Sequence, residues 1–403
     1  MQDTIPPITD KRMAVRVTAA AERAIRGGHP WLFASGIESV SFNGRAGDLA
    51  VIFDRKRRFR AIGLYDPDSP IRVRILQQGQ PVPINAAWFE QKIEAAARIR
   101  NGLPATGTTG YRLVHGENDG LPGLVVDRYA GTLVMKLYTA AWLPHLGQVV
   151  AAITTVGGGQ RLVLRLSRAI QKQETFGLTD GQLLAGEPLA GPVHFQENGL
   201  WFAADVVRGQ KTGFFLDQRE NRARVEQLAH DKSVLNVFAY TGGFSLYAAR
   251  GGASQVVSLD LSEPALAMAV HNFALNHITT PHELLAGDAF QLMAQLAANG
   301  RQFDMVIIDP PSFAKKESEV ASALAAYSRL VGAGLKLLLP GGILVMSSCS
   351  SRIDAPSFFD LVHETARVVG QPLQEIERSG HPLDHPVGFK EGSYLKCLFA
   401  LVP

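Results

Sequence analysis

The stretch "SVLNVFAYTGGFSLYAARGGASQVVSLD" occupies residues 233–260. Two β-rich runs, 233–239 and 255–260, enclose a glycine turn and a short helical segment that ends at a glycine pair. A strand, a helix and a second strand form the repeating unit of doubly wound parallel sheets. The glycine turn leads directly into a helix N-terminus, a common ligand-binding position in such sheets. We therefore predict a doubly wound α/β domain here.

The same alternation of strand and helix continues to the C-terminus. Further β-rich runs are "HELLAGD", "FDMVIIDPPSF" and "GGILVMSSCS", and helical segments separate them. Upstream, short β-rich runs precede a mixed region that opens with a helix capped at Asn85. We therefore predict three domains: a β-rich domain at 11–85, a small central α/β domain at 86–192, and a doubly wound, mostly parallel α/β domain at 193–403.

Composition and cysteine content indicate a globular intracellular protein. The 403 residues are 46% hydrophobic and 19% charged, and two cysteines cannot form a disulfide framework. The first residues, "MQDTIPPITDKRMAVRV", show no apolar signal core, and no apolar run is long enough to span a bilayer. We expect a cytoplasmic location and no membrane partner, and no pattern in the sequence predicts a metal site.

Positive charge gathers near the N-terminus. Residues 11–76 contain 13 Lys and Arg against 6 Asp and Glu, in a chain whose net charge is +3. Such an imbalance favours contact with a polyanion such as a nucleic acid. The alternative is a solvated basic surface that has no partner.

Polar and glycine residues follow the predicted strands where a cofactor would bind. The turn at Gly242 and Gly243 lacks the G-x-G-x-x-G spacing of nicotinamide enzymes, which disfavours hydride transfer. Asp260 ends the second strand, 18 residues after Gly242, an interval typical of an acid that binds ribose hydroxyls. Asp288 ends the third strand, where it can contact an adenine ring. Helix capping is the alternative for both carboxylates, and together they predict a nucleoside cofactor.

The fourth strand of this domain ends in "DPPSF", residues 309–313. Two prolines make a rigid turn that presents carbonyl groups, with Asp309 at its mouth. A glycine turn, an acid after the second strand and this turn after the fourth match the pattern of S-adenosylmethionine-dependent methyltransferases. Amino-group methylases use a similar turn to hold a planar base, and that chemistry needs no cysteine.

Cys349 follows the fifth strand, in "SSCSS" at 347–351. Carboxyl ends of neighbouring parallel strands meet at one sheet edge, so we expect Cys349 beside Asp309. A thiolate that adds to C6 of a pyrimidine makes C5 nucleophilic enough to accept a methyl group. The alternative is a cysteine that packs as a small apolar residue. Cys397 lies in "YLKCLFALV", which is typical of a plain buried strand.

The chain resembles the RlmI-like family of bacterial large-subunit (23S) ribosomal RNA 5-methylcytosine methyltransferases, nearly from end to end. The most specific matches are "TGFFLDQRENR" at 212–222 and "DPPSFAK" at 309–315. The other matching stretches are "GHPWLFASGI" (28–37), "GENDGLPGLVVDRY" (116–129), "NVFAYTGGFS" (236–245) and "SSCS" (347–350). The resemblance implies an N-terminal PUA domain, a small central α/β domain and a Rossmann-like class I methyltransferase domain.

The resemblance also implies roles for individual residues. It makes Cys349 the nucleophile and places Asp309 against the cytosine edge, with S-adenosylmethionine as the cofactor. The residues it places around that cofactor are Asn236, Phe238, Thr241, Gly243, Asp260, Ser262 and Asp288, with Phe215 and Gln218 from the preceding loop. One departure from the wider 5-methylcytosine group is that Pro311 and Ser312 stand where many members carry a second, product-releasing cysteine. What removes the C5 proton is therefore left open.

Two alternatives remain at this stage. A methyltransferase acting on an exocyclic amine of guanine or adenine would use Asp309 without Cys349. A non-catalytic RNA-binding or ribosome-assembly protein would keep the basic domain and bind no S-adenosylmethionine. The sequence also leaves open which nucleotide is methylated, whether the 23S RNA is naked or partly assembled, and whether the protein is a homodimer.

Overall fold

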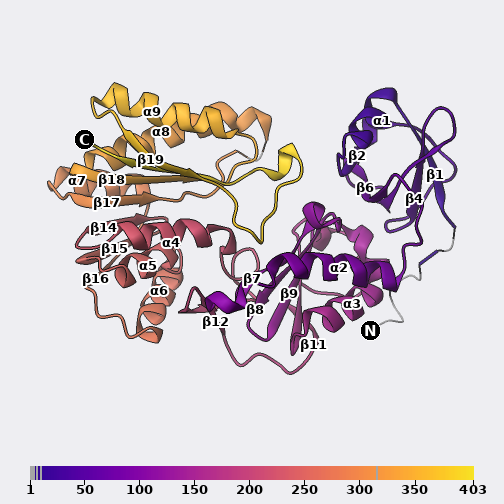
Figure 1. Cartoon of the computed structure of the whole chain (residues 1–403), viewed down its shortest axis with the longest axis horizontal. Coiled ribbons are helices and arrows are strands. Elements are labelled where there is room, and N and C mark those ends of the chain that lie inside the picture. The colour runs from indigo at the N-terminus through magenta and orange to yellow at the C-terminus, as the bar shows by residue number, and fades with distance from the viewer. Residues whose placement is uncertain (1–4, 6–7, 10, 315) are drawn as a thin grey trace. The chain divides into compact units, whose positions relative to one another are not determined.

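The computed structural model describes residues 5, 8–9, 11–314 and 316–403 (Figure 1). The chain divides into two compact units. The first unit comprises Met1–Gly199, Ala204–Leu216 and Leu383–Phe389, and the second comprises Leu200–Ala203, Asp217–Pro382 and Lys390–Pro403. The three-domain boundaries predicted from the sequence stay a prediction, because this division does not separate the β-rich part from the central part.

The first unit opens with a β-rich part built on a six-stranded sheet, with strand order β2-β6-β5-β4-β1-β3 among the described residues. Its elements are β1 (Met13–Val17), α1 (Ala19–Arg26), β2 (Trp31–Phe33), β3 (Ile37–Val40), β4 (Leu49–Phe53), β5 (Phe59–Tyr65) and β6 (Ile71–Gln78). In β1 buried and exposed residues alternate, so Met13, Val15 and Val17 enter the core while Ala14 and Arg16 face outward. The β-rich runs predicted in this region are confirmed as strands.

The central part of the first unit contains a five-stranded sheet of order β11-β10-β9-β8-β7. Its elements are α2 (Ala86–Arg100), β7 (Gly110–His115), β8 (Leu124–Tyr129), β9 (Thr132–Leu137), α3 (Leu146–Gly157), β10 (Arg161–Leu166) and β11 (Gln182–Ala185). The predicted cap is confirmed, because the Asn85 side chain accepts a hydrogen bond from the Trp88 amide. The hairpin of β12 (Val193–Glu197) and β13 (Leu200–Ala204) turns at Asn198 and Gly199, both with positive φ.

The β-rich and central parts share one hydrophobic core. Leu49, Leu64 and Leu76 from the six-stranded sheet belong to the same buried cluster as Trp88 and Trp142 of the central part. Removing the β-rich part would therefore expose apolar surface of the central part to water.

The second unit contains a seven-stranded sheet of order β16-β15-β14-β17-β18-β20-β19 among the described residues. Its strands are β14 (Ser233–Val237), β15 (Gln255–Asp260), β16 (His282–Ala286), β17 (Phe303–Ile308), β18 (Leu338–Ser348), β19 (Gln374–Ser379) and β20 (Lys396–Leu401). The pairs from β16 to β18 are parallel, and β20 pairs antiparallel with both β18 and β19. The predicted doubly wound, mostly parallel sheet is confirmed.

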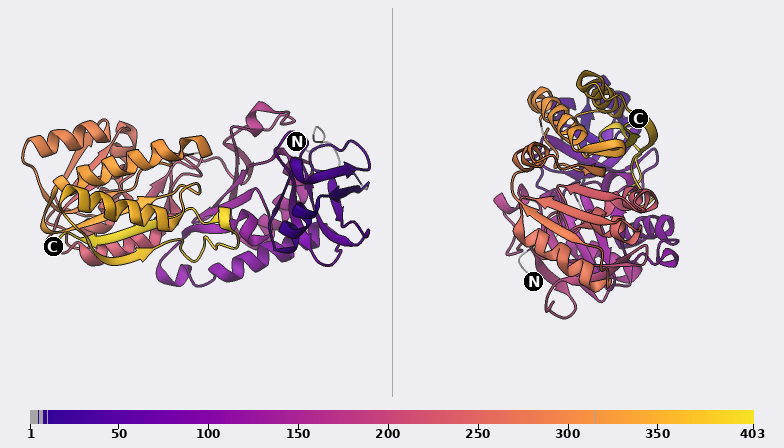
Figure 2. Two further views of the ribbon diagram at one scale, coloured as in Figure 1. Left: turned by 90° about the horizontal axis from the view of Figure 1, so that it is seen from above. Right: turned by 90° about the vertical axis from the view of Figure 1, so that its left-hand side faces the viewer.

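Helices cover both faces of this sheet (Figures 1 and 2). They are α4 (Arg219–Leu228), α5 (Gly243–Arg250), α6 (Glu263–Leu275), α7 (Ala289–Ala298), α8 (Val320–Lys336) and α9 (Ala355–Val369). Helices α4, α5 and α6 pack in one layer, and α7, α8 and α9 pack in the other. Strands β14 and β17 are almost fully buried between the layers, which explains their continuous apolar runs. No helix in the described ranges is long and apolar enough to cross a bilayer.

Candidate active site at the carboxyl edge of the parallel strands

The strand order reverses direction between β14 and β17. From β14 the chain moves outward to β15 and β16, then returns to β17 on the other side of β14 and continues to β18. In doubly wound sheets this reversal opens a crevice at the carboxyl ends of the strands, where ligands bind. Most of the candidate site residues from the sequence lie on or just after these strands, whereas Phe215 and Gln218 precede α4.

The loop after β14 has an unusual backbone. Phe238, Tyr240 and Gly242 all adopt positive φ, at 63°, 48° and 75°. A side chain on Gly242 would place its Cβ 2.7 Å from the Cβ of Ala269, so only glycine fits there. Positive φ at two bulky residues costs free energy, and such strain is concentrated at functional sites. The loop therefore has the tight, close-approach backbone of a ligand-binding turn.

Asp260 joins this loop to the end of β15. One of its carboxylate oxygens accepts a hydrogen bond from the Tyr240 amide at 2.8 Å, and the other accepts from the Ser262 amide at 2.9 Å. The Ser262 hydroxyl in turn caps α6, by accepting a bond from the Ala265 amide. A carboxylate oxygen can accept more than one hydrogen bond, so these contacts leave capacity for ribose hydroxyls.

Buried polar side chains line the base of the turn. The Asn236 amide donates to the Ser245 hydroxyl at 2.9 Å, and the hydroxyls of Ser245 and Ser258 are bonded at 2.6 Å. Asn236 Oδ1 and Thr241 Oγ1 are buried, yet neither has a hydrogen-bond partner among the described residues. Buried polar atoms normally have partners, so two such atoms beside a glycine turn fit a polar ligand. These residues fit a nucleoside cofactor.

Three other residues were predicted to lie around the cofactor: Asp288, Gly243 and Phe215. Asp288 is exposed and caps α7, with its carboxylate accepting from the Gln291 amide at 3.0 Å. Gly243 is buried and is the first residue of α5. Phe215 belongs to the first unit, where the Lys211 ammonium lies 4.4 Å from the centre of its ring. Contact of these residues with a cofactor stays a prediction.

Asp309 and Cys349 leave adjacent strands at the same edge. Strands β17 and β18 pair in parallel with Ile308 opposite Met346, so both strands deliver their next residues to the same edge. The Cys349 sulfur lies 4.0 Å from the carbonyl oxygen of Pro310, in the turn that follows Asp309. Both side chains are partly exposed. The predicted proximity of the thiol to the Asp-Pro-Pro turn is therefore observed.

Gln218 contacts Asp309 directly. Its amide Nε2 donates to Asp309 Oδ1 at 2.9 Å, and its Oε1 accepts from Asn221 Nδ2 at 2.5 Å. Gln218 is 2% exposed, so its side chain is held in one orientation. The family resemblance placed Gln218 around the cofactor. In the structure its side chain is bonded to the Asp309 carboxylate, and its contact with the cofactor stays a prediction.

Two residues near Cys349 were missed by sequence reasoning. The Tyr327 hydroxyl is bonded to the Ser348 hydroxyl at 2.9 Å, and burial, with smaller contributions from Cys349 and Asp309, raises its pKa to about 12. The Lys396 ammonium donates to the carbonyl oxygens of Ser350 and Tyr394. A lysine inside the apolar run "YLKCLFALV" was a usable signal, because lysine is rarely buried without a specific reason.

Cys397 lies in a buried strand, as its sequence context predicted. It lies fully buried in β20, and burial raises the pKa of its thiol to about 12. A thiol with so high a pKa is not ionised at neutral pH and makes a poor nucleophile.

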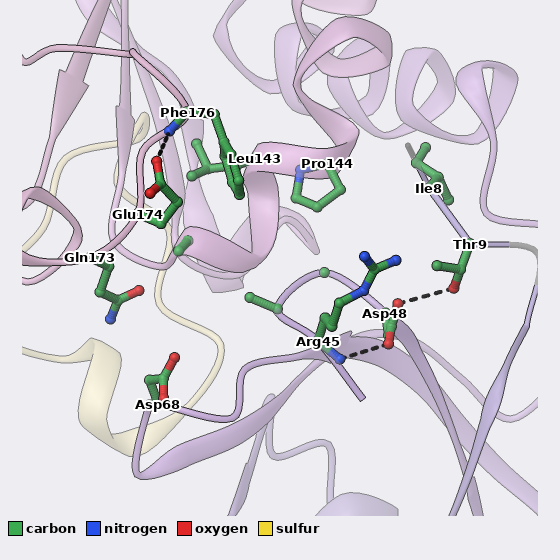
Figure 3. A pocket seen from close by; sticks show the side chains of 13 residues that line it. Ile8, Thr9, Arg45, Asp48, Asp68, Leu143, Pro144, Gln173, Glu174 and Phe176 are labelled. Carbon is green, nitrogen blue, oxygen red and sulfur yellow. Dashed lines mark hydrogen bonds between the residues drawn. The ribbon is translucent and has the colours of Figure 1, made fainter. Parts of the chain in front are cut away.

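A cavity of about 150 Å³ lies in the first unit (Figure 3). Its lining includes Arg45, Asp48, Pro144 and Glu174, and the Asp48 carboxylate accepts hydrogen bonds from Thr9 and from the Arg45 amide. The unit that contains this cavity contributes neither Asp309 nor Cys349. The cavity is therefore not part of the candidate active site.

Comparison with known proteins identifies the class. Residues 112–399 match the model of an S-adenosylmethionine-dependent methyltransferase family, and residues 15–78 match that of a PUA-like domain. A candidate methyltransferase complexed with SAH shares the fold with a TM-score of 0.84, at 23% identity over 97% of this chain and 100% of that one. A candidate SAM-dependent methyltransferase from Streptococcus mutans gives a TM-score of 0.83, at 23% identity over 96% and 100%. The fold and the strand-end residues define an S-adenosylmethionine-dependent methyltransferase.

Sequence relatives narrow the family. The chain is 48% identical to a ribosomal RNA large subunit methyltransferase of Deinococcus radiodurans, over 98% of each chain. It is 37% identical to ribosomal RNA large subunit methyltransferase I of Photobacterium profundum, over 95% of this chain and 98% of that one. The chain therefore belongs to the same family of large-subunit ribosomal RNA methyltransferases as these two proteins. The predicted family, fold class and cofactor are confirmed.

Proposed function

We propose that this protein methylates C5 of a cytosine in large-subunit (23S) ribosomal RNA, through a covalent bond between Cys349 Sγ and C6 of the base. One observation carries the proposal: Cys349 and Asp309 leave adjacent strands at the same sheet edge, and the Cys349 sulfur lies 4.0 Å from the carbonyl oxygen of Pro310, the residue after Asp309. The names of the relatives indicate large-subunit ribosomal RNA as the substrate. The thiol at this position favours cytosine as the target base and C5 as the methylated atom.

The need for a thiol follows from the chemistry of the ring. C5 of cytosine is a weak nucleophile, and addition of the Cys349 thiolate to C6 moves the electrons of the C5–C6 double bond onto C5. S-adenosylmethionine supplies an electrophilic methyl group when bound. After C5 has accepted the methyl group, a base removes the C5 proton. The electron pair of that C–H bond then restores the double bond and expels Cys349 as a thiolate.

Asp309 assists the addition step. As the thiolate adds, negative charge develops at N3 of the ring, and a proton taken up from solvent and held between N3 and the Asp309 carboxylate stabilises it. The hydrogen bond from Gln218 Nε2 to Asp309 Oδ1 holds the carboxylate in place before the base arrives. Preorganisation of this kind lowers the barrier, because little rearrangement is needed as the charge develops.

The proton at C5 must leave without help from a second cysteine. Ser312 stands in the region where that cysteine would lie, and its hydroxyl donates to the Ala314 carbonyl at 3.2 Å. A serine hydroxyl that is not activated by a neighbouring base accepts a proton poorly at neutral pH. Water or another side chain must therefore accept the C5 proton.

The basic β-rich part fits the role of an RNA-docking surface. The run Arg55, Lys56, Arg57 and Arg58 is exposed on the loop between β4 and β5. Lysine and arginine on such a surface bind phosphates and position the RNA without reading its sequence. The target cytosine must then leave its stack to reach Cys349. The cytoplasmic location and the homodimer stay predictions.

A trapping experiment tests the proposal. RNA that carries 5-fluorocytidine at the target accepts the methyl group, but fluorine cannot leave C5 as a proton does. We expect a protein–RNA adduct that survives denaturing gels, requires S-adenosylmethionine, and maps to the peptide that contains Cys349. Methylation of ordinary RNA by a Cys349→Ala protein would contradict the proposal and favour methylation of an exocyclic amine, for which Asp309 alone suffices. Failure to bind S-adenosylmethionine would instead favour a non-catalytic RNA-binding protein.

A further inference from the structure

A lysine is buried next to the strand end that carries Cys349. Lys396, the first residue of β20, pairs with Ser348 of β18, so it stands opposite the residue that precedes the thiol. Its side chain belongs to a residue that is only 3% exposed. Burying an ammonium is costly unless it is hydrogen bonded and compensated by negative charge.

The hydrogen bonds of Lys396 hold the turn that follows Cys349. Within the described chain, its ammonium donates to the main-chain carbonyls of Ser350, Ile353 and Tyr394. An ammonium has three donors, so these three acceptors satisfy it and retain it in the protonated form. Two of the acceptors belong to the turn that links β18 to α9. Lys396 therefore ties the turn beside the thiol to strand β20.

The titratable groups near the thiol come from several segments of the chain. Burial lowers the pKa of Lys396 to about 8, and the negative charges of Cys349 and Asp354 oppose that shift. The attraction is mutual, so an ammonium that is favoured by the thiolate also favours the thiolate. Tyr327 on α8 interacts electrostatically with Cys349 and with Asp309, the residue that follows β17. A negative charge on Asp309 would oppose ionisation of a neighbouring thiol. The positive charge of Lys390 helps to lower the pKa of Asp354, which lies next to the same turn.

We propose that Lys396 is a positioning residue for the reaction, which fixes the 350–353 turn and supplies the positive charge that keeps Cys349 ionised beside Asp309. The inference rests on the proposed function of Cys349 as the nucleophile. It assigns a role to strand β20, whose sequence is otherwise that of a plain core strand.

Alkylation of the thiol tests this role without using the methylation reaction. Iodoacetamide reacts with thiolates, so its rate at Cys349 across the pH range reports the midpoint of ionisation. In full-length Lys396→Met protein we expect this midpoint to rise by about one pH unit, which is about tenfold slower alkylation at neutral pH. Lys396→Arg keeps the charge, and we expect its rate to stay within about threefold of the wild type. The buried Cys397 serves as an internal reference in the same digest.

A matched control is Lys390→Met, which removes an exposed lysine near the same turn and should leave the alkylation profile of Cys349 unchanged. A Lys396→Met profile equal to that of the wild type overturns the proposal, and so does an equal shift in Lys390→Met. If the Lys396→Met protein does not bind S-adenosylhomocysteine, the Lys396→Arg protein provides the test instead. Arginine keeps the positive charge, so a raised midpoint of Cys349 ionisation in this variant would show that the charge is not what keeps the thiol ionised.

The kinetics separate positioning from general support of the fold. Lys396→Met should lower kcat at neutral pH and recover toward the wild type as the pH rises to about 9, with KM for RNA unchanged. A deficit that is the same at every pH contradicts the inference. Absence of the 5-fluorocytidine adduct in wild-type protein would reject the proposed function and leave the alkylation result standing. An adduct with an unshifted Lys396→Met profile would reject only the role of Lys396.

Discussion

The side-chain amide of Gln218 donates a 2.9 Å hydrogen bond to Asp309 Oδ1, although 91 residues separate the two in sequence. Gln218 belongs to the stretch "TGFFLDQRENR" and Asp309 to "DPPSF". The bond thus joins the most specific stretches of the chain at a single carboxylate. It explains why a buried glutamine precedes α4, and it makes Gln218 part of the base-binding apparatus that we propose.

The first prediction concerns this bond. In Gln218→Ala the carboxylate of Asp309 loses a donor and its fixed orientation, so kcat for RNA methylation should fall about tenfold or more. Steady-state kinetics on target RNA measure this effect, with calorimetry of S-adenosylhomocysteine binding as a check on folding. Gln227→Ala, at an exposed position of α4, the helix that Gln218 precedes, should retain wild-type kcat. Equal kcat in the two variants would remove Gln218 from the mechanism.

The two cysteines should behave in opposite ways. Cys349→Ala should abolish methylation and the 5-fluorocytidine adduct while RNA and cofactor binding persist, because a nucleophile acts mainly in the chemical step. Cys397→Ala should form the adduct normally and lose about 1 kcal/mol of unfolding free energy, since it leaves a small cavity in the core. Denaturing gels and urea denaturation of both variants distinguish these effects. A Cys397→Ala protein that forms no adduct, though folded, would contradict the assignment of the nucleophile.

Asp260 should matter for the cofactor. Asp260→Ala removes the acceptors for the Tyr240 and Ser262 amides and for the ribose hydroxyls, and should weaken S-adenosylmethionine binding by about 2 kcal/mol, or roughly 30-fold. Calorimetry gives the affinity directly. Asp354→Ala removes a carboxylate that caps α9 by a similar bond and should leave the affinity unchanged. Unchanged affinity in Asp260→Ala would show that this carboxylate only shapes the loop.

RNA binding should depend on salt and on the exposed basic run between β4 and β5. Because the β-rich part shares a core with the central part, charge removal is a cleaner test than deletion of residues 11–76. Replacing Arg55, Lys56 and Arg57 with glutamine should weaken RNA binding and lower the slope of log Kd against log salt by about two to three. Filter binding from low to physiological salt measures that slope. An unchanged slope, with S-adenosylhomocysteine affinity intact, would exclude this run as a docking surface.

His282 should make the fold sensitive to mild acid. Burial lowers its pKa from 6.5 to about 4, and its Nε2 is hydrogen bonded to the Ser258 hydroxyl at 2.8 Å. Between these pH values the unfolded chain binds a proton that the folded chain does not, so unfolding free energy falls as the pH is lowered from 6.5 to 4. The loss is at most about 1.4 kcal/mol per pH unit, and less because the ring is partly exposed.

Urea denaturation at pH 7 and pH 5 checks the role of His282. The variant His282→Gln should lose less stability than the wild type over this interval, because it carries no group that titrates there. His230→Gln, at an exposed position, should show the pH dependence of the wild type. Identical pH dependence in all three proteins would mean that other groups dominate the acid sensitivity.

Much of the fold could be predicted because the signals for strands, turns and helix caps lie within a few neighbouring residues. Asn85 caps the helix that it was expected to begin, and the strand, glycine turn and helix expected within residues 233–260 are present. Proximity of Cys349 to the Asp-Pro-Pro turn was also predictable, because neighbouring parallel strands bring their carboxyl ends to one edge. These inferences need only periodicity, capping chemistry and the connection rules of parallel sheets.

Local sequence signals were thus enough to predict the doubly wound sheet, the sheet edge where a cofactor would bind, and the placement of Cys349 near Asp309. It did not show what holds that pair, because Gln218 reaches Asp309 across 91 residues and Lys396 reaches the Ser350 carbonyl across 46. Both contacts depend on how separate segments pack, and the second depends on the antiparallel register that sets Lys396 opposite Ser348. Periodicity and capping are read within a few residues, whereas the compensation of a buried charge is settled only when distant strands pair.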